Sequence, residues 1–169
     1  MQIIYLPDHL MIISYIILWP TIQLTVAIIC NGISDKHFTP NSFWLKPKKW
    51  EKDGEIYETI FKVHSWKKYL PDGARVHKNG FQKRHITSSD PEYLEAFIAE
   101  TGRAEIIHWL EISPFWIFGL WSPPIVILIM LAYALIINMP CIIAQRYNRP
   151  RLIKHYKHSV EKQARKNNS

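Results

Sequence analysis

Residues 112–145 read ISPFWIFGLWSPPIVILIMLAYALIINMPCIIAQ, a run of 34 residues without one Asp, Glu, Lys or Arg. As a single helix this run would be about 51 Å long, too long for one crossing of a hydrocarbon core about 30 Å thick. Ser122-Pro123-Pro124 divides it, since Ser122 suits a helix N-cap and Pro123 suits the first turn. The sequence therefore predicts a membrane helix over residues 124–145, preceded by a short membrane or re-entrant helix over residues 106–121.

A second uncharged run of 26 residues lies near the N-terminus, at residues 9–34. It corresponds to about 39 Å of helix, and we predict a membrane helix over residues 9–32. Pro20 lies mid-span and is expected to kink this helix rather than end it, because lipid offers no water to a frayed backbone. A cleaved signal peptide is the alternative. The first eight residues carry no Lys or Arg, so we expect the segment to be retained.

The 169 residues include 21 Lys and Arg against 14 Asp and Glu, a net charge of +7, and apolar residues make up 48% of the chain. The two apolar runs exclude long disorder, and two cysteines, Cys30 and Cys141, are too few for a disulfide scaffold. One water-soluble domain of this size cannot bury both runs. The sequence therefore predicts a mainly α-helical, small integral membrane protein with two or three membrane helices.

The distribution of basic residues indicates an orientation. Every Lys and Arg lies either in residues 33–105, which hold 13, or after Gln145, where there are 8. If residues 106–144 enter the bilayer and return, both basic regions share the cytoplasmic side, as the positive-inside rule prefers. We therefore predict a multi-pass protein of the cell membrane, with its N-terminus outside and its central and C-terminal regions in the cytoplasm. A single crossing is the alternative.

Residues 33–105 form a polar segment rich in aromatic side chains, which suit either the lipid headgroup layer or a small core. We predict a small aromatic-rich cytoplasmic cap here, with a helix over residues 55–62 and a turn at Pro71-Asp72-Gly73. Ser89-Asp90-Pro91-Glu92 predicts a helix start, and Thr101-Gly102 predicts the end of that helix. Residues 146–169 are expected to form a basic cytoplasmic tail lying as a surface helix. The aromatic residues of the cap are Phe38, Phe43, Trp44, Trp50, Tyr57, Phe61, Trp66, Tyr69 and Phe81.

Three ionisable residues at the start of the second apolar run form the sharpest candidate site. Glu105, His108 and Glu111 fall at i, i+3 and i+6, so a helix places them on one polar stripe. A histidine oriented by a carboxylate is a competent general base near neutral pH, and we take His108, oriented by Glu105, as the candidate catalytic pair. The alternative is that the pair only anchors the helix at the headgroups. Glu-x-x-His also occurs in di-metal bundles, but the chain lacks a second copy, so no metal is expected.

A second candidate site follows the second membrane helix. Asn138 lies two residues before a proline, and Arg146, Arg149 and Arg151 occur within six residues of one another. Guanidinium groups bind phosphate in a bidentate manner, so these arginines can clamp a phosphate; the alternative is anchoring to anionic lipid. No nucleic-acid recognition motif accompanies the basic charge, and no nucleic-acid partner is expected. Our candidate substrate-binding residues are Arg103, Trp109, Glu111, Asn138, Gln145, Arg146, Asn148, Arg149 and Arg151.

Several of these motifs resemble a known family. Arg103-Ala-Glu-x-x-His-Trp, Asn138-x-Pro and the run from Gln145 to Arg151, which reads QRYNRPR, are similar to the glycosyl-diaponeurosporenoate acyltransferases, small membrane enzymes of the staphyloxanthin pathway in Gram-positive bacteria. Trp66-Lys67 ahead of Asp72-Gly73, and the pair Arg84-His85, resemble the central region of that family. The resemblance covers roughly residues 33–152.

The resemblance implies a membrane acyltransferase that esterifies the sugar hydroxyl of a carotenoid glycoside, glycosyl-4,4'-diaponeurosporenoate, with a fatty acyl group, as the last step of the pathway. It implies no cofactor and no metal. The co-substrate is an acyl donor, and the residues do not decide whether this donor is a coenzyme A thioester, an acyl carrier protein or a phospholipid. Other enzymes of the pathway are expected partners. The alternative function is a non-enzymatic membrane scaffold for a lipid or carotenoid pathway.

Overall fold

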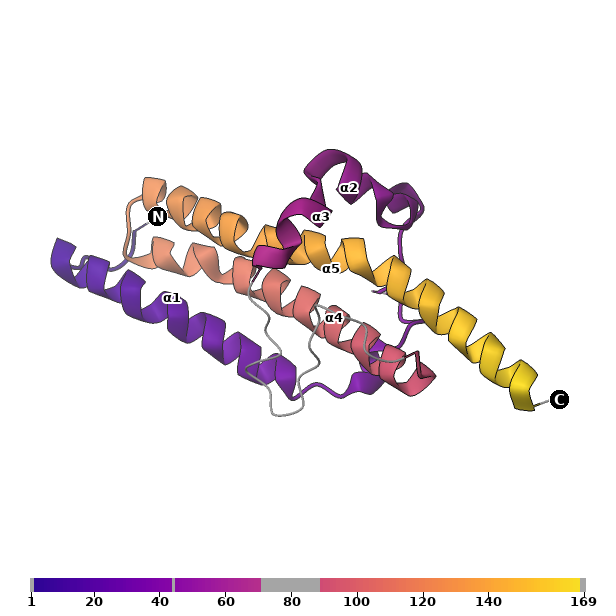
Figure 1. Cartoon of the computed structure of the whole chain (residues 1–169). Coiled ribbons are helices and arrows are strands. Elements are labelled where there is room, and N and C mark those ends of the chain that lie inside the picture. Colours follow the sequence, from indigo (N-terminus) through magenta and orange to yellow (C-terminus); the bar gives the residue numbers. More distant parts are fainter. Residues whose placement is uncertain (1, 44, 71–88, 168–169) are drawn as a thin grey trace. The chain divides into compact units, whose positions relative to one another are not determined.

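The computed structural model describes residues 2–43, 45–70 and 89–167, and within these ranges the regular structure is helical. The three long helices are α1 (Asp8–Asn31), α4 (Pro91–Ile112) and α5 (Pro124–Asn167), as Figure 1 shows. The mainly helical prediction is confirmed in this part of the chain. The shorter helices are η1 (Asp35–Phe38), η2 (Lys49–Gly54), α2 (Glu55–Phe61), α3 (Val63–Trp66), η3 (Lys67–Tyr69) and η5 (Ser113–Leu120).

Several predicted boundaries are confirmed. The side chain of Asp90 accepts a hydrogen bond from the backbone of Tyr93 at 3.4 Å, and α4 begins at Pro91. The predicted break before residue 124 separates η5 from α5, and α1 continues through Pro20. The predicted turn at residues 71–73, Trp44, Phe81 and the pair Arg84-His85 lie outside the described residues.

The chain divides into two compact units. Unit 1 comprises Met1–Ile33 and Glu105–Ile142, and unit 2 comprises Ser34–Ala104 and Ile143–Ser169. Helices α4 and α5 each contribute residues to both units.

The core of unit 1 is aromatic. Trp19 of α1 stacks on Phe118 of η5 with ring centroids 5.2 Å apart, and it meets Tyr133 of α5 edge-on at 5.5 Å. Trp121 also packs on Phe118, with ring centroids 5.6 Å apart. Such offset and edge-to-face pairs contribute about 0.5–1.5 kcal/mol each beyond the area they bury. The cluster therefore joins α1, η5 and the first half of α5.

Polar contacts place the start of α1 at the same end of unit 1 as the connection between η5 and α5. The backbone amides of Ile3 and Ile4 both donate to the carbonyl of Leu120, each at 2.8 Å. The hydroxyls of Tyr15 and Ser122 lie 2.6 Å apart. Within unit 1, α1 and α5 therefore run parallel from this end, and the segment from Glu105 to Leu120 runs antiparallel to both.

The outer surface of unit 1 is apolar. Helix α1 and the first part of α5 are both long and apolar enough to cross a membrane. Only 6% of the residues in the most apolar part of α1, and 17% of those in the most apolar part of α5, are buried within the protein. In water, these helices would therefore expose many large apolar side chains. The exposed ones include Ile12, Ile16, Leu24, Ile28, Leu128, Ile129 and Ile136.

Unit 2 corrects one sequence prediction. Thr101-Gly102 does not end a helix, because α4 continues through both residues to Ile112. The glycine serves close packing instead: a Cβ atom at Gly102 would lie 2.6 Å from the buried side chain of Leu45. A glycine within a helix and a glycine that caps one are the same letter in the sequence, and only the neighbouring segment distinguishes them.

A small helical hairpin completes unit 2, and the predicted helix over residues 55–62 is confirmed as α2. Gly54, the last residue of η2, has φ +89°, and a Cβ atom there would lie 2.9 Å from the carbonyl oxygen of Tyr147. Glycine is needed at this position both for the left-handed backbone and for the close approach to α5. Tyr57, Val63, Ala144 and Tyr147 form the core of this region.

Candidate functional site

The candidate site in unit 1 is a polar cluster inside an apolar body. His108 and Glu111 come from α4, and Asn138 comes from α5. His108 Nδ1 lies 2.8 Å from Asn138 Oδ1 and 3.2 Å from Glu111 Oε2. Asn138 is fully buried, at 0% exposure. Two helices therefore fix one imidazole nitrogen between two side-chain oxygens.

These contacts determine the tautomer of neutral His108. Asn138 Nδ2 donates to the carbonyl of Ala134 at 3.0 Å, which leaves Oδ1 of Asn138 directed at the imidazole. Both neighbours of Nδ1 are then acceptors, so Nδ1 carries the proton and donates it. The lone pair of neutral His108 is consequently on Nε2, which is the nitrogen that can accept a proton.

The carboxylate on His108 Nδ1 is that of Glu111, one helical turn after the histidine, whereas the sequence pattern assigned Glu105, one turn before it. Glu105 is buried at 4% exposure, and its assignment as the orienting group stays a prediction. Both carboxylates lie on the predicted stripe, so spacing alone does not choose between them. Asn138, predicted as substrate-binding, is the second group on Nδ1. Trp109 is exposed, and its assignment as substrate-binding stays a prediction.

Sequence reasoning missed one neighbour of the histidine. The thiol of Cys141 lies within hydrogen-bonding reach of the His108 side chain. Cys141 is buried at 9% exposure and follows Asn138 by three residues. That i, i+3 spacing on α5 is the signal in the sequence, because residues three apart share a helix face.

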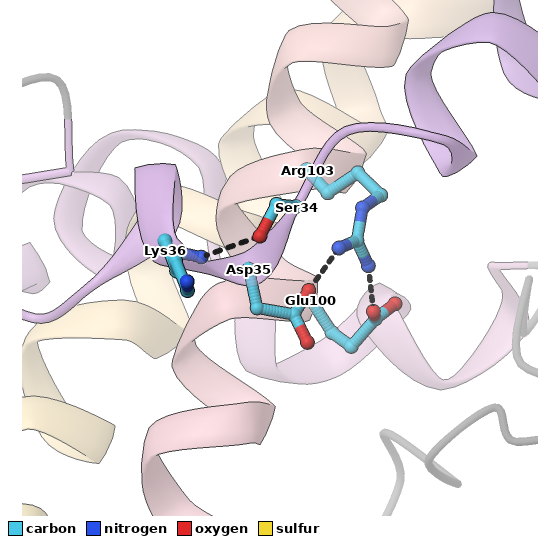
Figure 2. A network of polar contacts seen from close by, with 5 residues as sticks. All are labelled: Ser34, Asp35, Lys36, Glu100 and Arg103. Carbon is cyan, nitrogen blue, oxygen red and sulfur yellow. Dashed lines mark hydrogen bonds and ion pairs between the residues drawn. The ribbon is translucent and has the colours of Figure 1, made fainter.

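Arg103 lies in unit 2 and is bound within the protein. Figure 2 shows its guanidinium between the carboxylates of Asp35 and Glu100, with which it forms two ion pairs. The guanidinium also lies over the ring of Phe38, 5.4 Å from the centroid. Arg103 is buried, and these contacts join α4 to the segment that begins unit 2.

Arg146 is paired with a buried carboxylate that the sequence analysis did not single out. Its Nη1 lies 3.0 Å from Glu51 Oε1, and Glu51 is only 3% exposed. Glu51 also accepts hydrogen bonds from the Tyr57 hydroxyl and from the backbone amide of Lys48. Burial by itself raises the pKa of Glu51, but these donors and the charge of Arg146 outweigh it, and the pKa is lowered below its ordinary value.

Arg149 joins α5 to α4 within unit 2. Its Nη2 donates to the carbonyl of Thr101 at 3.0 Å, its Nε donates to the hydroxyl of Thr101 at 3.2 Å, and the side chain is buried. The three arginines of the QRYNRPR run therefore do different things. Arg146 and Arg149 are bound inside the unit, whereas Arg151 is exposed.

The remaining predicted residues of this run lie around Tyr147. Asn148 Oδ1 accepts a hydrogen bond from the Lys67 ammonium at 2.9 Å, and Arg151 Nη1 donates to the carbonyl of Tyr147 at 2.6 Å. Gln145 is half-buried. Over residues 2–43, 45–70 and 89–167, no three His, Cys, Asp or Glu side chains are grouped closely enough to hold a metal ion.

Comparisons with known proteins agree with these motifs. The family model described as glycosyl-4,4'-diaponeurosporenoate acyltransferase matches residues 40–158. The chain belongs to this family. Proteins with the same name from Staphylococcus aureus strains bovine RF122 / ET3-1, MRSA252 and USA300 are each 40% identical over 134 residues, which cover 79% of this chain and 81% of the relative. No solved structure matches the chain.

Family membership assigns the enzyme class. The family and the relatives are named acyltransferases, so the predicted resemblance and the prediction of an acyltransferase are both confirmed. The matched region includes His108, Asn138 and the whole QRYNRPR run. An acyltransferase needs a group that accepts the proton of the attacking nucleophile, and His108 has the geometry for that role.

Proposed function

We propose that the chain transfers a fatty acyl group from a thioester donor to a sugar hydroxyl of glycosyl-4,4'-diaponeurosporenoate, the carotenoid glycoside for which its relatives are named. In a staphyloxanthin-type pathway this is the last step. The observation that carries the proposal is the fixed imidazole of His108 in a member of an acyltransferase family. Glu111 and Asn138 hold Nδ1, and Nε2 faces the reaction as the general base.

In the proposed reaction, His108 Nε2 takes the proton of the sugar hydroxyl as its oxygen attacks the acyl carbonyl. A tetrahedral intermediate forms and then loses the donor's sulfur, so an ester bond replaces the thioester bond. The imidazolium returns the proton to the departing thiolate, and His108 ends in its starting state. Glu111 stabilises the transient positive charge on the imidazole, because its carboxylate lies 3.2 Å from Nδ1.

Both substrates carry long apolar chains with a polar reacting end, so we place the reaction at a membrane surface. The antiparallel segment from Glu105 to Leu120 is about 28 Å long, as eight residues of α-helix followed by eight of 3₁₀-helix. The part of α5 in unit 1 has about the same length, close to the hydrocarbon thickness of about 30 Å. On this topology unit 1 lies in the bilayer, and His108 lies one turn inside its boundary at Glu105.

The test of the reaction is pigment mass spectrometry in cells that make the carotenoid glycoside. We expect the wild-type chain to add the mass of one fatty acyl group to the glycoside, and His108→Ala to leave the glycoside unmodified. The matched control is His155→Ala, an exposed histidine of α5, which is expected to retain transfer. Full transfer by His108→Ala would exclude the histidine as base. A scaffold would instead change the amounts of several intermediates and add no acyl group.

The topology is tested separately by cysteine labelling in intact cells. The starting chain carries Cys30→Ser and Cys141→Ala and therefore has no cysteine. A single cysteine is then introduced in three separate variants, Tyr5→Cys, Lys46→Cys and Lys157→Cys, and each variant is treated with a membrane-impermeant maleimide. We expect labelling of Tyr5→Cys from outside, and labelling of the other two only after the cells are opened. Labelling of Lys157→Cys in intact cells would contradict the proposed hairpin.

A further inference from the structure

Two cations of unit 2 share one aromatic ring. The Lys67 ammonium lies 4.8 Å from the centroid of the Tyr147 ring, and the Arg151 guanidinium carbon lies 3.9 Å from the same centroid. Lys67 comes from η3 and Arg151 from α5, so two segments far apart in the sequence bring these charges together. Cation–π attraction to the ring holds both groups in place.

Further contacts fix both side chains. Lys67 donates to Asn148 Oδ1 at 2.9 Å, and Arg151 donates through Nη1 to the Tyr147 carbonyl at 2.6 Å. An ammonium has three donors and a guanidinium has five, so each group keeps donors for a ligand. Arg151 is exposed and Lys67 is half-buried, which leaves the pair accessible from solvent.

The local charge is predominantly positive. Burial lowers the pKa of Lys67, the charge of Arg151 lowers it further, and Glu58 opposes both. The carboxylate of Glu58 itself accepts a hydrogen bond from the backbone amide of His64 at 2.9 Å and one from the Tyr147 side chain. Two cations beside the same ring repel each other, and one carboxylate offsets this repulsion only in part. An anion that contacts both cations reduces the repulsion further.

This arrangement differs from that of the neighbouring arginines. Arg146 is matched by the buried carboxylate of Glu51, and Arg149 binds Thr101 away from solvent. Both are among the arginines predicted to clamp a phosphate, and that assignment stays a prediction. Arg149 is buried and Arg146 is paired with a carboxylate, whereas Arg151 is exposed and Lys67 is half-buried. A point charge beside a planar, bidentate donor is also a common way for proteins to bind phosphate oxygens.

We propose that Lys67 and Arg151, held against Tyr147 and Asn148, bind the phosphate groups of the acyl donor. This inference rests on the proposed function for the identity of the donor and extends it to the donor's chemical class, a phosphate-bearing pantetheine thioester. Coenzyme A and acyl carrier protein both present such a group. Two cations suit the pyrophosphate of coenzyme A better than the single diester of the carrier protein.

The test uses the full-length protein in detergent or lipid nanodiscs and measures both kinetics and binding. We expect Lys67→Gln and Arg151→Gln each to raise the KM for acyl coenzyme A roughly tenfold, with the KM for the glycoside unchanged, because each removes one charge-assisted contact. Lys154→Gln removes the same charge from an exposed position one turn further along α5 and is expected to change neither value. Lys67→Arg, which keeps the charge, is expected to restore most of the affinity.

Direct binding of free coenzyme A, by equilibrium dialysis, separates this inference from the proposed function. Weaker binding by Lys67→Gln, in a protein that fails to acylate the glycoside, would retain the phosphate site and reject the proposed acceptor. Transfer with an unchanged donor KM in both variants would reject the site and retain the function. A defect confined to acyl carrier protein assays would identify the carrier as the source of the phosphate. Reduced affinity only for vesicles rich in phosphatidylglycerol would overturn the inference in favour of a lipid contact.

Discussion

His108 Nδ1 lies 2.8 Å from Oδ1 of Asn138, a side chain that is fully buried on a different helix. The amide nitrogen of Asn138 is bound to the carbonyl of Ala134, so its oxygen is directed at the histidine. In the proposed reaction this relationship determines which imidazole nitrogen acts as the base. We therefore propose Asn138 as a positioning residue, which acts through His108.

Asn138→Ala is expected to lower kcat by about tenfold and to leave both KM values nearly unchanged, because Glu111 alone would then hold the imidazole. The measurement is steady-state acyl transfer by the purified protein. The pH profile supplies a second readout, since loss of an acceptor on Nδ1 shifts the pH at which the base loses its proton. Ala132→Gly, at an exposed site on the same helix, is the control for a general loosening of α5. An unchanged kcat and profile would contradict the positioning role.

Cys141→Ala is expected to retain transfer. In the proposed reaction the sugar hydroxyl attacks the donor directly, so no step uses the thiol of Cys141. The check is activity of the variant, together with the intact mass of wild-type protein quenched during turnover. Loss of transfer, with one acyl group trapped on Cys141 in the wild type, would instead establish an acyl-enzyme in which His108 activates the thiol.

Arg146→Ala is expected to destabilise the protein by about 3 kcal/mol, since it leaves the buried carboxylate of Glu51 without its cation. Thermal unfolding in detergent measures the effect, with Lys154→Ala as the control for loss of an exposed charge. Adding Glu51→Gln to Arg146→Ala should recover part of the loss, because the isolated buried charge is then removed. If the double variant is as unstable as the sum of both single variants, the pairing is not the cause.

The buried carboxylate of Glu51 is expected to make the stability of the protein depend on pH. Its pKa in the folded protein is below the ordinary value of 4.5, so the folded state favours the ionised form. The resulting stabilisation is fully present above pH 4.5 and is lost as the pH falls through the lowered pKa of Glu51. Unfolding midpoints measured from neutral pH down to acid should therefore fall more steeply for wild type than for Glu51→Gln. Parallel curves for the two proteins would refute this prediction.

Local pattern was sufficient for the positions of several elements. Asp90-Pro91 marks the start of α4 because a side-chain cap and a proline act within one turn, and the prolines before residue 125 mark the break for the same reason. The prediction that Thr101-Gly102 ends a helix was wrong. Glycine is needed at position 102 because the side chain of Leu45, more than fifty residues earlier in the chain, packs against it. The histidine was found from its spacing, but its partner Asn138 lies thirty residues away.

By itself, the sequence determined the helical character, the two long apolar segments, the family and the candidate base His108. These depend on composition, periodicity and motifs, which neighbouring residues specify together. Tertiary structure alone decided that Glu111 and Asn138 hold the imidazole, that Arg146 and Arg149 bind groups of the protein, and that Lys67 joins Arg151 on Tyr147. The physical reason is that a side chain's partner depends on how two distant helices are rotated against each other, and the packing of the core sets that rotation.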